Sequence, residues 1–107
     1  MDKNISFQRG NYNKGRYKFN RQLLPTPAAY YTQQFAKLRI RSEWVKVRCC
    51  FHEDKVPSLS INMVQGHFKC HACGARGGNI LSFHRQRYQL SFIEAARALG
   101  AWEANDE

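Results

Sequence analysis

Two short pairs of metal-binding side chains constrain the fold of this chain more than any other feature. Cys49 and His52 are separated by two residues, as are Cys70 and Cys73, and 17 residues lie between the two pairs. A two-residue gap lets one tight turn point both side chains at a single tetrahedral ion. Paired turns of this kind, carried by a small antiparallel sheet, are typical of a zinc ribbon.

The same segment offers more candidate ligands than one ion needs. Residues 49–73 contain all four cysteines and three of the four histidines. Cys50 has only one residue between it and His52, which is a poorer chelate spacing, so we expect Cys50 to be a spare thiol beside the turn. Non-ligand roles are also expected for the other histidines, which are His67, His71 and His84.

Three thiolates and one imidazole fill the shell of a tetrahedral zinc ion and leave no position for water. This donor set therefore predicts one structural Zn²⁺ and not a catalytic one. A chain of 107 residues buries only a small core, so zinc binding would supply folding free energy on the order of 10 kcal/mol. The predicted ligands are Cys49, His52, Cys70 and Cys73.

Hydrophobic periodicity around the ligand pairs predicts an α+β fold. Thr26 and Pro27 are a typical helix start, and an apolar stripe then predicts a helix that ends near residues 38–40. Alternation over residues 44–48 and 58–62, followed by 67–70, predicts a three-stranded antiparallel sheet. Two helices are expected after the sheet, over 79–88 with Asn79 as N-cap and over 91–99 with a Ser91–Glu94 capping box.

The net charge is confined to the part of the chain before the first cysteine. Residues 1–48 contain eleven Lys and Arg against two acids, whereas residues 49–107 contain six of each sign. A basic excess of this size favours a polyanionic partner, above all nucleic acid. The alternative is a charge that only keeps a small protein in solution, and the aromatic residues between the basic ones favour nucleic acid.

The composition divides the chain into three expected parts. Residues 1–24 form a basic, flexible arm, residues 25–102 form the zinc-binding domain, and residues 103–107 form an acidic tail. Two interpretations of the arm have equal weight: its cations and aromatics contact nucleic acid, or they only pack back on the domain. No apolar stretch reaches the length of a membrane span or a signal sequence, so we expect a cytoplasmic protein.

Motifs beyond the ligands point to one family. They are Cys49-x-Phe-His52, Pro57-Ser58-x-Ser60-Ile61, Phe68-Lys69-Cys70-x-x-Cys73-Gly74-Ala75, Gly77-Gly78, Phe83 and Leu90-Ser-Phe-x-Glu-Ala. In these residues the chain resembles the N-terminal Cys-His-Cys-Cys zinc-binding domain of bacterial- and phage-type DNA primases, over roughly residues 40–100. The resemblance implies a zinc ribbon flanked by helices that contacts single-stranded template DNA and helps select where a primer starts.

The chain departs from the family pattern at two positions and in length. Cys50 stands where the family usually has Pro, and Asn79 stands where it often has an acid. Primases continue into a catalytic domain with an acidic metal-binding cluster, and this sequence has none. We therefore expect that the chain does not synthesise primers on its own.

Three functional hypotheses follow, in decreasing order of weight. The first is a stand-alone primase-type zinc module that binds DNA, with a primase, helicase or other partner on a separate chain. The second is a mobile-element protein that uses this fold to bind and regulate or inhibit a host or replication protein complex, and the third is an enzyme. For the first, the predicted nucleic-acid-binding residues are Arg41, Trp44, Lys46, Arg48, Lys55, Lys69 and Arg76.

Overall fold

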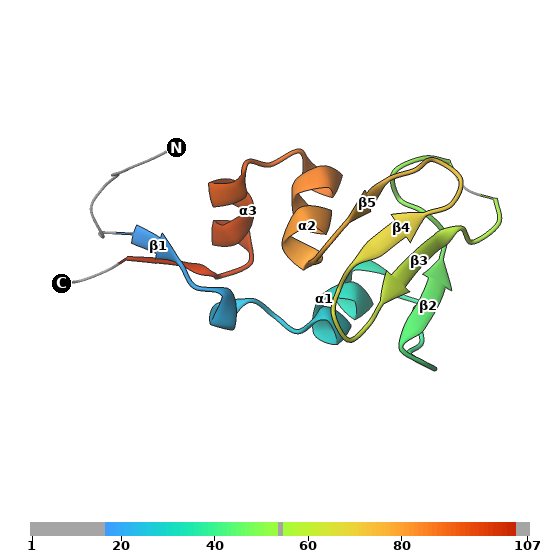
Figure 1. Ribbon diagram of the computed structural model, residues 1–107, viewed down its shortest axis with the longest axis horizontal. Coiled ribbons are helices and arrows are strands. Elements are labelled where there is room, and N and C mark those ends of the chain that lie inside the picture. The colour runs from blue at the N-terminus through green and yellow to red at the C-terminus, as the bar shows by residue number, and fades with distance from the viewer. Residues whose placement is uncertain (1–16, 54, 105–107) are drawn as a thin grey trace. The chain divides into compact units, whose positions relative to one another are not determined.

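The computed structural model of the protein, shown in Figure 1, describes residues 17–53 and 55–104. The chain divides into two compact units, Met1–Leu24 with Ala96–Glu107, and Pro25–Ala95. The elements of the described part are β1 (Tyr17–Phe19), the 3-10 helix η1 (Arg21–Leu23), α1 (Pro27–Gln34), β2 (Trp44–Val47), β3 (Leu59–Asn62), β4 (Phe68–Cys70), β5 (Arg76–Gly77), α2 (Ile80–Tyr88), α3 (Phe92–Ala98) and β6 (Trp102–Ala104).

The larger unit is built on an antiparallel sheet of four strands in the order β2-β3-β4-β5 (Figure 1). The α+β class and the three strands expected from alternation are confirmed. The fourth strand, β5, was not predicted, because two residues are too few to show an alternating pattern. Its register with β4 places Gly77 opposite Phe68.

One face of this sheet forms the core of the unit. Leu59, Ile61 and Phe68 point into it and are almost completely buried. Phe83 of α2 lies at the centre with no exposed surface, and its ring makes edge-to-face contacts with Phe68 at 5.0 Å and Tyr31 of α1 at 5.1 Å. Burial of each such side chain contributes about 1.5–3 kcal/mol, so this aromatic cluster joins both helices to the sheet.

The first helix begins as predicted and ends earlier than predicted. Thr26 is the N-cap, its hydroxyl accepting from the Ala29 N–H at 3.1 Å, and Pro27 is the first helical residue. The backbone becomes extended at Phe35, whereas the apolar stripe predicts a helix to residues 38–40. Phe35 packs at 6.0 Å from the Phe83 ring, a tertiary contact that local helix propensity does not reveal.

The later helices keep their predicted caps. The Asn79 side chain accepts from the Ser82 N–H at 2.8 Å and starts α2. Ser91 and Glu94 form the predicted capping box of α3, with reciprocal bonds of 2.8 Å and 3.1 Å between each backbone N–H and the other side chain. Among the described residues, none of the helices has the length and apolar character needed to cross a membrane.

The smaller unit contains a short strand pair that the sequence does not predict. β1 and β6 are antiparallel, with Phe19 opposite Trp102. The Asn20 N–H donates to the Ala101 carbonyl at 2.7 Å, and the Asn20 side chain donates to the Glu103 carboxylate at 2.9 Å. These strands fall in segments expected to be a flexible arm and tail, and most of the arm lies outside the described residues.

Candidate metal centre

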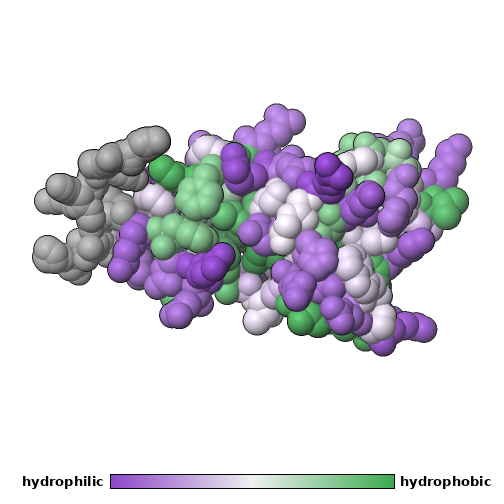
Figure 2. Space-filling view, in the orientation of Figure 1, coloured by the Kyte–Doolittle hydropathy of each residue, from purple (hydrophilic) through white to green (hydrophobic). Residues whose placement is uncertain are grey.

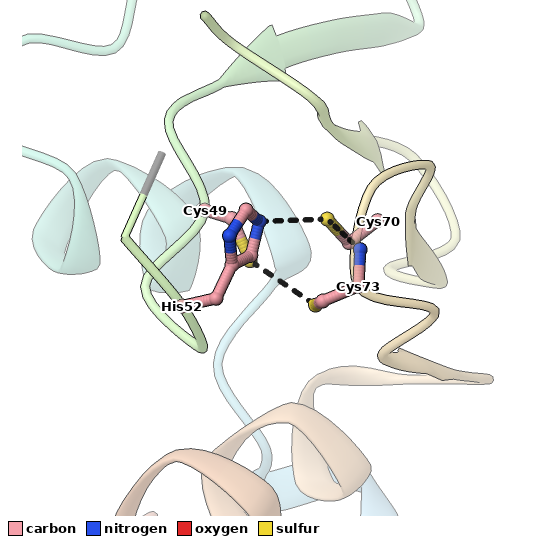
Figure 3. A group of neighbouring side chains, drawn as sticks. All are labelled: Cys49, His52, Cys70 and Cys73. Carbon is pink, nitrogen blue, oxygen red and sulfur yellow. Dashed lines mark hydrogen bonds between the residues drawn. The ribbon is translucent and has the colours of Figure 1, made fainter. Parts of the chain in front are cut away.

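The two predicted ligand pairs meet at one end of the four-stranded sheet. Cys49 and His52 lie in the turn that follows β2, while Cys70 ends β4 and Cys73 lies in the next turn. Figure 3 shows the four side chains pointing toward one another from these two facing loops. All four ligand atoms lie within 4.8 Å of one another, so the cluster is compact enough for one metal ion.

The measured separations match a tetrahedral zinc site. With Zn–S bonds near 2.3 Å and Zn–N bonds near 2.0 Å, tetrahedral geometry requires S···S distances of about 3.8 Å and S···N distances of about 3.6 Å. The Cys49 and Cys73 sulfurs are 3.9 Å apart, and the Cys70 sulfur lies 3.3 Å from His52 Nε2. The donor set and the spacing both fit zinc, and the thiolates disfavour the oxygen-preferring cations Mg²⁺ and Ca²⁺.

The His52 ring is oriented by a backbone carbonyl. Its Nδ1 lies 2.8 Å from the carbonyl oxygen of Glu53, an acceptor, so Nδ1 carries the proton and donates. The lone pair is therefore on Nε2, which is the nitrogen that faces Cys70 (Figure 3). A metal-binding histidine ordinarily has its second nitrogen fixed in this way.

The surroundings of Cys70 stabilise its thiolate form. Its sulfur, which has no exposed surface, accepts from the backbone N–H groups of Ala72 and Cys73 and lies within hydrogen-bonding distance of the Ser58 hydroxyl, each at 3.4 Å. Burial by itself raises the pKa of the Cys70 thiol, but these hydrogen bonds outweigh it and lower the pKa to about 5. The negative charge is thus stabilised by the turn itself, before any metal is considered.

The Cys49 thiol, in contrast to that of Cys70, has a raised pKa. Burial raises the pKa of its thiol to about 12, and the nearby Cys70 and Cys73 add to this effect, while the Phe51 N–H opposes it. Several thiolates cannot share this volume without a compensating positive charge. A bound divalent cation supplies that charge, which is why such a cluster binds metal and not protons near neutral pH.

A glycine makes the second turn possible. Gly74 has φ of 83°, a conformation that side-chain-bearing residues rarely adopt, and its N–H donates to the Cys70 carbonyl at 3.0 Å. A Cβ added at Gly74 would meet no atom within 4 Å. The requirement for glycine is therefore one of backbone conformation and not of space.

The remaining cysteine and histidines lie outside the cluster. Cys50 is half-buried, and burial raises the pKa of its thiol. His71 lies 3.1 Å from the Ser60 hydroxyl, and His84 Nδ1 lies 2.8 Å from the Tyr30 hydroxyl. The structure thus gives each of these residues surroundings other than the four converging ligand atoms.

The predicted nucleic-acid-binding residues are divided between two surfaces. Strand register places Lys46 opposite Ser60, Ser60 opposite Lys69, and Lys69 opposite Arg76, so three cations form one row across the exposed face of the sheet. Trp44 lies on the same face at its end. We call Trp44, Lys46, Ser60, Lys69 and Arg76 the open face.

A pocket of about 540 Å³ opens beside Trp44 on this face. The indole is 48% exposed, and the His67 ring contacts it edge to face with centroids 4.9 Å apart. Gly77 forms part of the wall, where a Cβ would come within 2.7 Å of the Phe68 ring, so the wall must remain bare backbone. Figure 2 shows mainly hydrophilic residues over the visible surface of β2–β5, with small hydrophobic islands between them.

The other predicted cations lie elsewhere. Arg41 and Arg48 line a second groove, beside the outer edge of β2, and Lys46 borders it as well. Lys55 is exposed in the loop that follows the first ligand turn. Lys37 and Arg39 line the same groove and were not predicted, although basic and apolar residues alternate over 37–41.

Comparison with known proteins supports the zinc-ribbon interpretation. Residues 30–105 match the family described as the CHC2 zinc finger. A DNA primase of Mycolicibacterium smegmatis is 36% identical over 61 residues, which cover 57% of this chain and 9% of that protein. The Gene 58 protein of Mycobacterium phage D29 is 42% identical over 55 residues, covering 51% of this chain and 42% of that protein.

A solved structure shows the same arrangement. The crystal structure of the Aquifex aeolicus primase (zinc-binding and RNA polymerase domains) superimposes with a TM-score of 0.57 and 26% identity, over 69% of this chain and 18% of that one. This chain thus spans less than half the length of each of these relatives. The family match over residues 30–105 includes all four residues of the metal cluster.

Proposed function

This chain belongs to the CHC2 zinc finger family, and from that premise we propose that its open face binds single-stranded DNA during replication or priming. The row formed by Lys46, Lys69 and Arg76 carries this proposal. Lys69 and Arg76 are directly opposed on β4 and β5, and Lys46 lies on β2 across Ser60 from Lys69. Such a row is suited to the phosphates of an extended strand.

Each part of the open face has a defined role in this proposal. The cations neutralise phosphates and release counterions, which makes the affinity fall steeply as salt increases. Trp44 offers an exposed indole beside a pocket of about 540 Å³, and an unpaired base stacks on it. Stacking of this kind requires unpaired bases, so the proposal favours single-stranded over duplex DNA.

Zinc has a structural role in this function. Cys49, His52, Cys70 and Cys73 would hold it, and four protein ligands leave it no open position. The ion supplies a fixed crosslink between the ends of β2 and β4. The residues of the open face, and not the metal, then contact DNA.

In the relatives that are named primases, the matched region is a small part of a longer protein. We propose that the present chain supplies the template-binding step and that any polymerase activity belongs to a separate catalytic domain. The basic arm, residues 1–24, adds further phosphate contacts in this proposal. The proposal assigns no catalytic residue to this chain.

The test measures the affinity of the zinc-loaded protein for a fluorescein-labelled oligo(dT), by fluorescence anisotropy at several salt concentrations. We define the face variant as Lys69→Ala/Arg76→Ala. It should bind about tenfold or more weakly, with a salt slope reduced by about two, because two phosphate contacts are lost. The matched control is the groove variant, Lys37→Ala/Arg39→Ala, which removes the same charge from another surface.

Three outcomes would contradict the proposal. Affinity could be independent of salt, both double variants could lose equal affinity, or Trp44→Ala could bind like the unchanged protein. Trp44→Phe retains a stacking ring and should preserve most of the affinity, whereas Trp44→Ala should lose about 1–3 kcal/mol. Because about half of the Trp44 side chain is exposed, neither change should alter the fold.

A further inference from the structure

A groove distinct from the Trp44 pocket runs beside the outer edge of β2. Its volume is about 530 Å³. Both walls come from the larger unit: one is β2 with the residue after it, and the other is the segment that follows α1. The lining residues, which we call the edge groove, are Phe35, Ala36, Lys37, Leu38, Arg39, Arg41, Val45, Lys46, Val47 and Arg48.

The edge groove contains backbone groups that no other strand covers. In the described part of the chain β2 pairs only with β3. The Met63 N–H donates to the Glu43 carbonyl at 2.7 Å, which fixes the phase of this pairing, so the N–H and C=O groups of Trp44 and Lys46 point outward. The Ser42 hydroxyl donates to the Trp44 carbonyl at 2.7 Å, and the outward groups of Lys46 remain at the groove.

The side chains of the groove combine one sign of charge with an apolar floor. Five of its ten residues are Lys or Arg and none is acidic. No ion pair of these five cations occurs among residues 17–53 and 55–104. Phe35, Leu38, Val45 and Val47 are half-buried between them, so the groove presents apolar surface within a ring of positive charge.

We propose that the edge groove binds an acidic, extended segment of a partner protein, which adds to the sheet as a strand beside β2. Strand addition uses main-chain hydrogen bonds for affinity and alternate side chains for specificity. The apolar side chains of such a segment would cover the floor, and its carboxylates would face the five cations. An exposed edge of only four residues provides few backbone bonds, so the charges must contribute much of the affinity.

A protein segment fits this groove better than a nucleic acid does. Single-stranded nucleic acid needs aromatic faces on which bases stack. The only aromatic ring in the lining, that of Phe35, already packs against Phe83 at 6.0 Å and lies under the Arg87 guanidinium at 5.8 Å. Outward-pointing N–H and C=O groups on a strand edge match a peptide backbone, whereas a DNA sugar-phosphate chain can accept from the N–H groups but has no donor for the C=O groups.

The test uses a labelled peptide of alternating Glu and Val and the zinc-loaded protein, with binding measured by anisotropy. Binding should be saturable and should weaken about tenfold or more in the groove variant, Lys37→Ala/Arg39→Ala, while the face variant, Lys69→Ala/Arg76→Ala, keeps the affinity of the unchanged protein. A peptide with the same side chains but N-methylated on alternate amides should also bind about tenfold more weakly, because it cannot pair with β2. Lys46 is left unchanged because it borders both surfaces.

The two double variants separate this proposal from the proposed DNA binding. If the groove variant loses affinity for oligo(dT) and keeps its affinity for the peptide, the groove binds nucleic acid and the inference is wrong. Unsaturable peptide binding, or equal binding of the N-methylated peptide, would also overturn it. If instead the face variant keeps its affinity for oligo(dT) and the groove variant loses affinity for the peptide, the DNA-binding proposal is wrong and the edge-groove proposal stands.

Discussion

Lys69 of β4 lies directly opposite Arg76 of β5, and both side chains are exposed on the open face. Two like charges at directly opposed positions of an antiparallel pair destabilise the sheet. The arrangement therefore lowers folding stability, and a bound polyanion would relieve the repulsion. This relationship makes a prediction in which stability and binding change in opposite directions.

The charge reversal Lys69→Glu should stabilise the fold and impair DNA binding. An opposite-charge pair with Arg76 replaces a repulsion, so the free energy of unfolding should rise by about 0.5 kcal/mol. Oligo(dT) affinity should fall because one phosphate contact becomes repulsive. Denaturant unfolding and anisotropy measure the two quantities, and Lys37→Glu is the control of equal charge change. A loss of both stability and binding would show that Lys69 is primarily structural.

The choice of metal ligands can be tested with two neighbouring cysteines. Cys50→Ser should retain one zinc per chain and nearly unchanged stability, whereas Cys73→Ser should lose most zinc affinity because a thiolate ligand is removed. Zinc released to a chromophoric chelator gives the stoichiometry, and circular dichroism reports the fold. Loss of zinc from Cys50→Ser with retention in a Cys49→Ser protein would mean that Cys50 is the first ligand.

A side chain at Gly74 should destabilise the fold, although there is space for one. Gly74→Ala should lower the free energy of unfolding of the zinc-loaded protein by about 1–2 kcal/mol, the usual cost of this left-handed conformation for a non-glycine residue. Gly78→Ala is the matched control: a Cβ there also meets no atom within 4 Å, and its φ is not positive. Equal effects at both positions would contradict the backbone explanation.

His84 should make stability depend on pH. Burial, aided by the Arg87 guanidinium, lowers the pKa of its imidazole below the ordinary value, and its ring also contacts Tyr30 and Tyr88. The unfolded chain therefore binds a proton at higher pH than the folded chain does. Stability attributable to His84 is complete above an unfolded pKa of about 6.5 and is lost as the pH falls toward the lower folded value.

The measurement is the free energy of unfolding of the zinc-loaded protein at neutral pH and about one unit below the unfolded histidine pKa. His84→Gln should show a smaller loss on acidification than the unchanged protein. Acid also displaces zinc from the thiolates in both proteins, so only the difference between them reports on His84. An identical pH dependence would show that the folded pKa of His84 is not lowered.

The sequence predicted best those features that depend on local spacing. The Thr26, Asn79 and Ser91–Glu94 caps each need only residues within one turn, and all three form. The ligand pairs are equally local, and the alternation around Ile61 and Phe68 sets the buried face. The zinc-ribbon family is confirmed for the same reason, since its motifs are short and ordered.

The features that escaped prediction depend on contacts between distant segments. The end of α1 is set by the packing of Phe35 on Phe83, 48 residues further along the chain. β5 and the β1–β6 pair are too short to have a pattern of their own. The predicted basic surface divides into two because Arg41 precedes β2 and Arg48 follows it, outside the strand pairing that aligns Lys46, Lys69 and Arg76.

The two ligand turns follow strands that do not pair with each other. Cys49 follows β2 and Cys70 ends β4, while β3 lies between them. A metal in this position crosslinks the ends of β2 and β4 across β3. Without the metal, that end of β2 would be fixed only by its pairing with β3. Removal of zinc by a chelator should therefore loosen the open face and the edge groove together, so that the supply of zinc would control both surfaces.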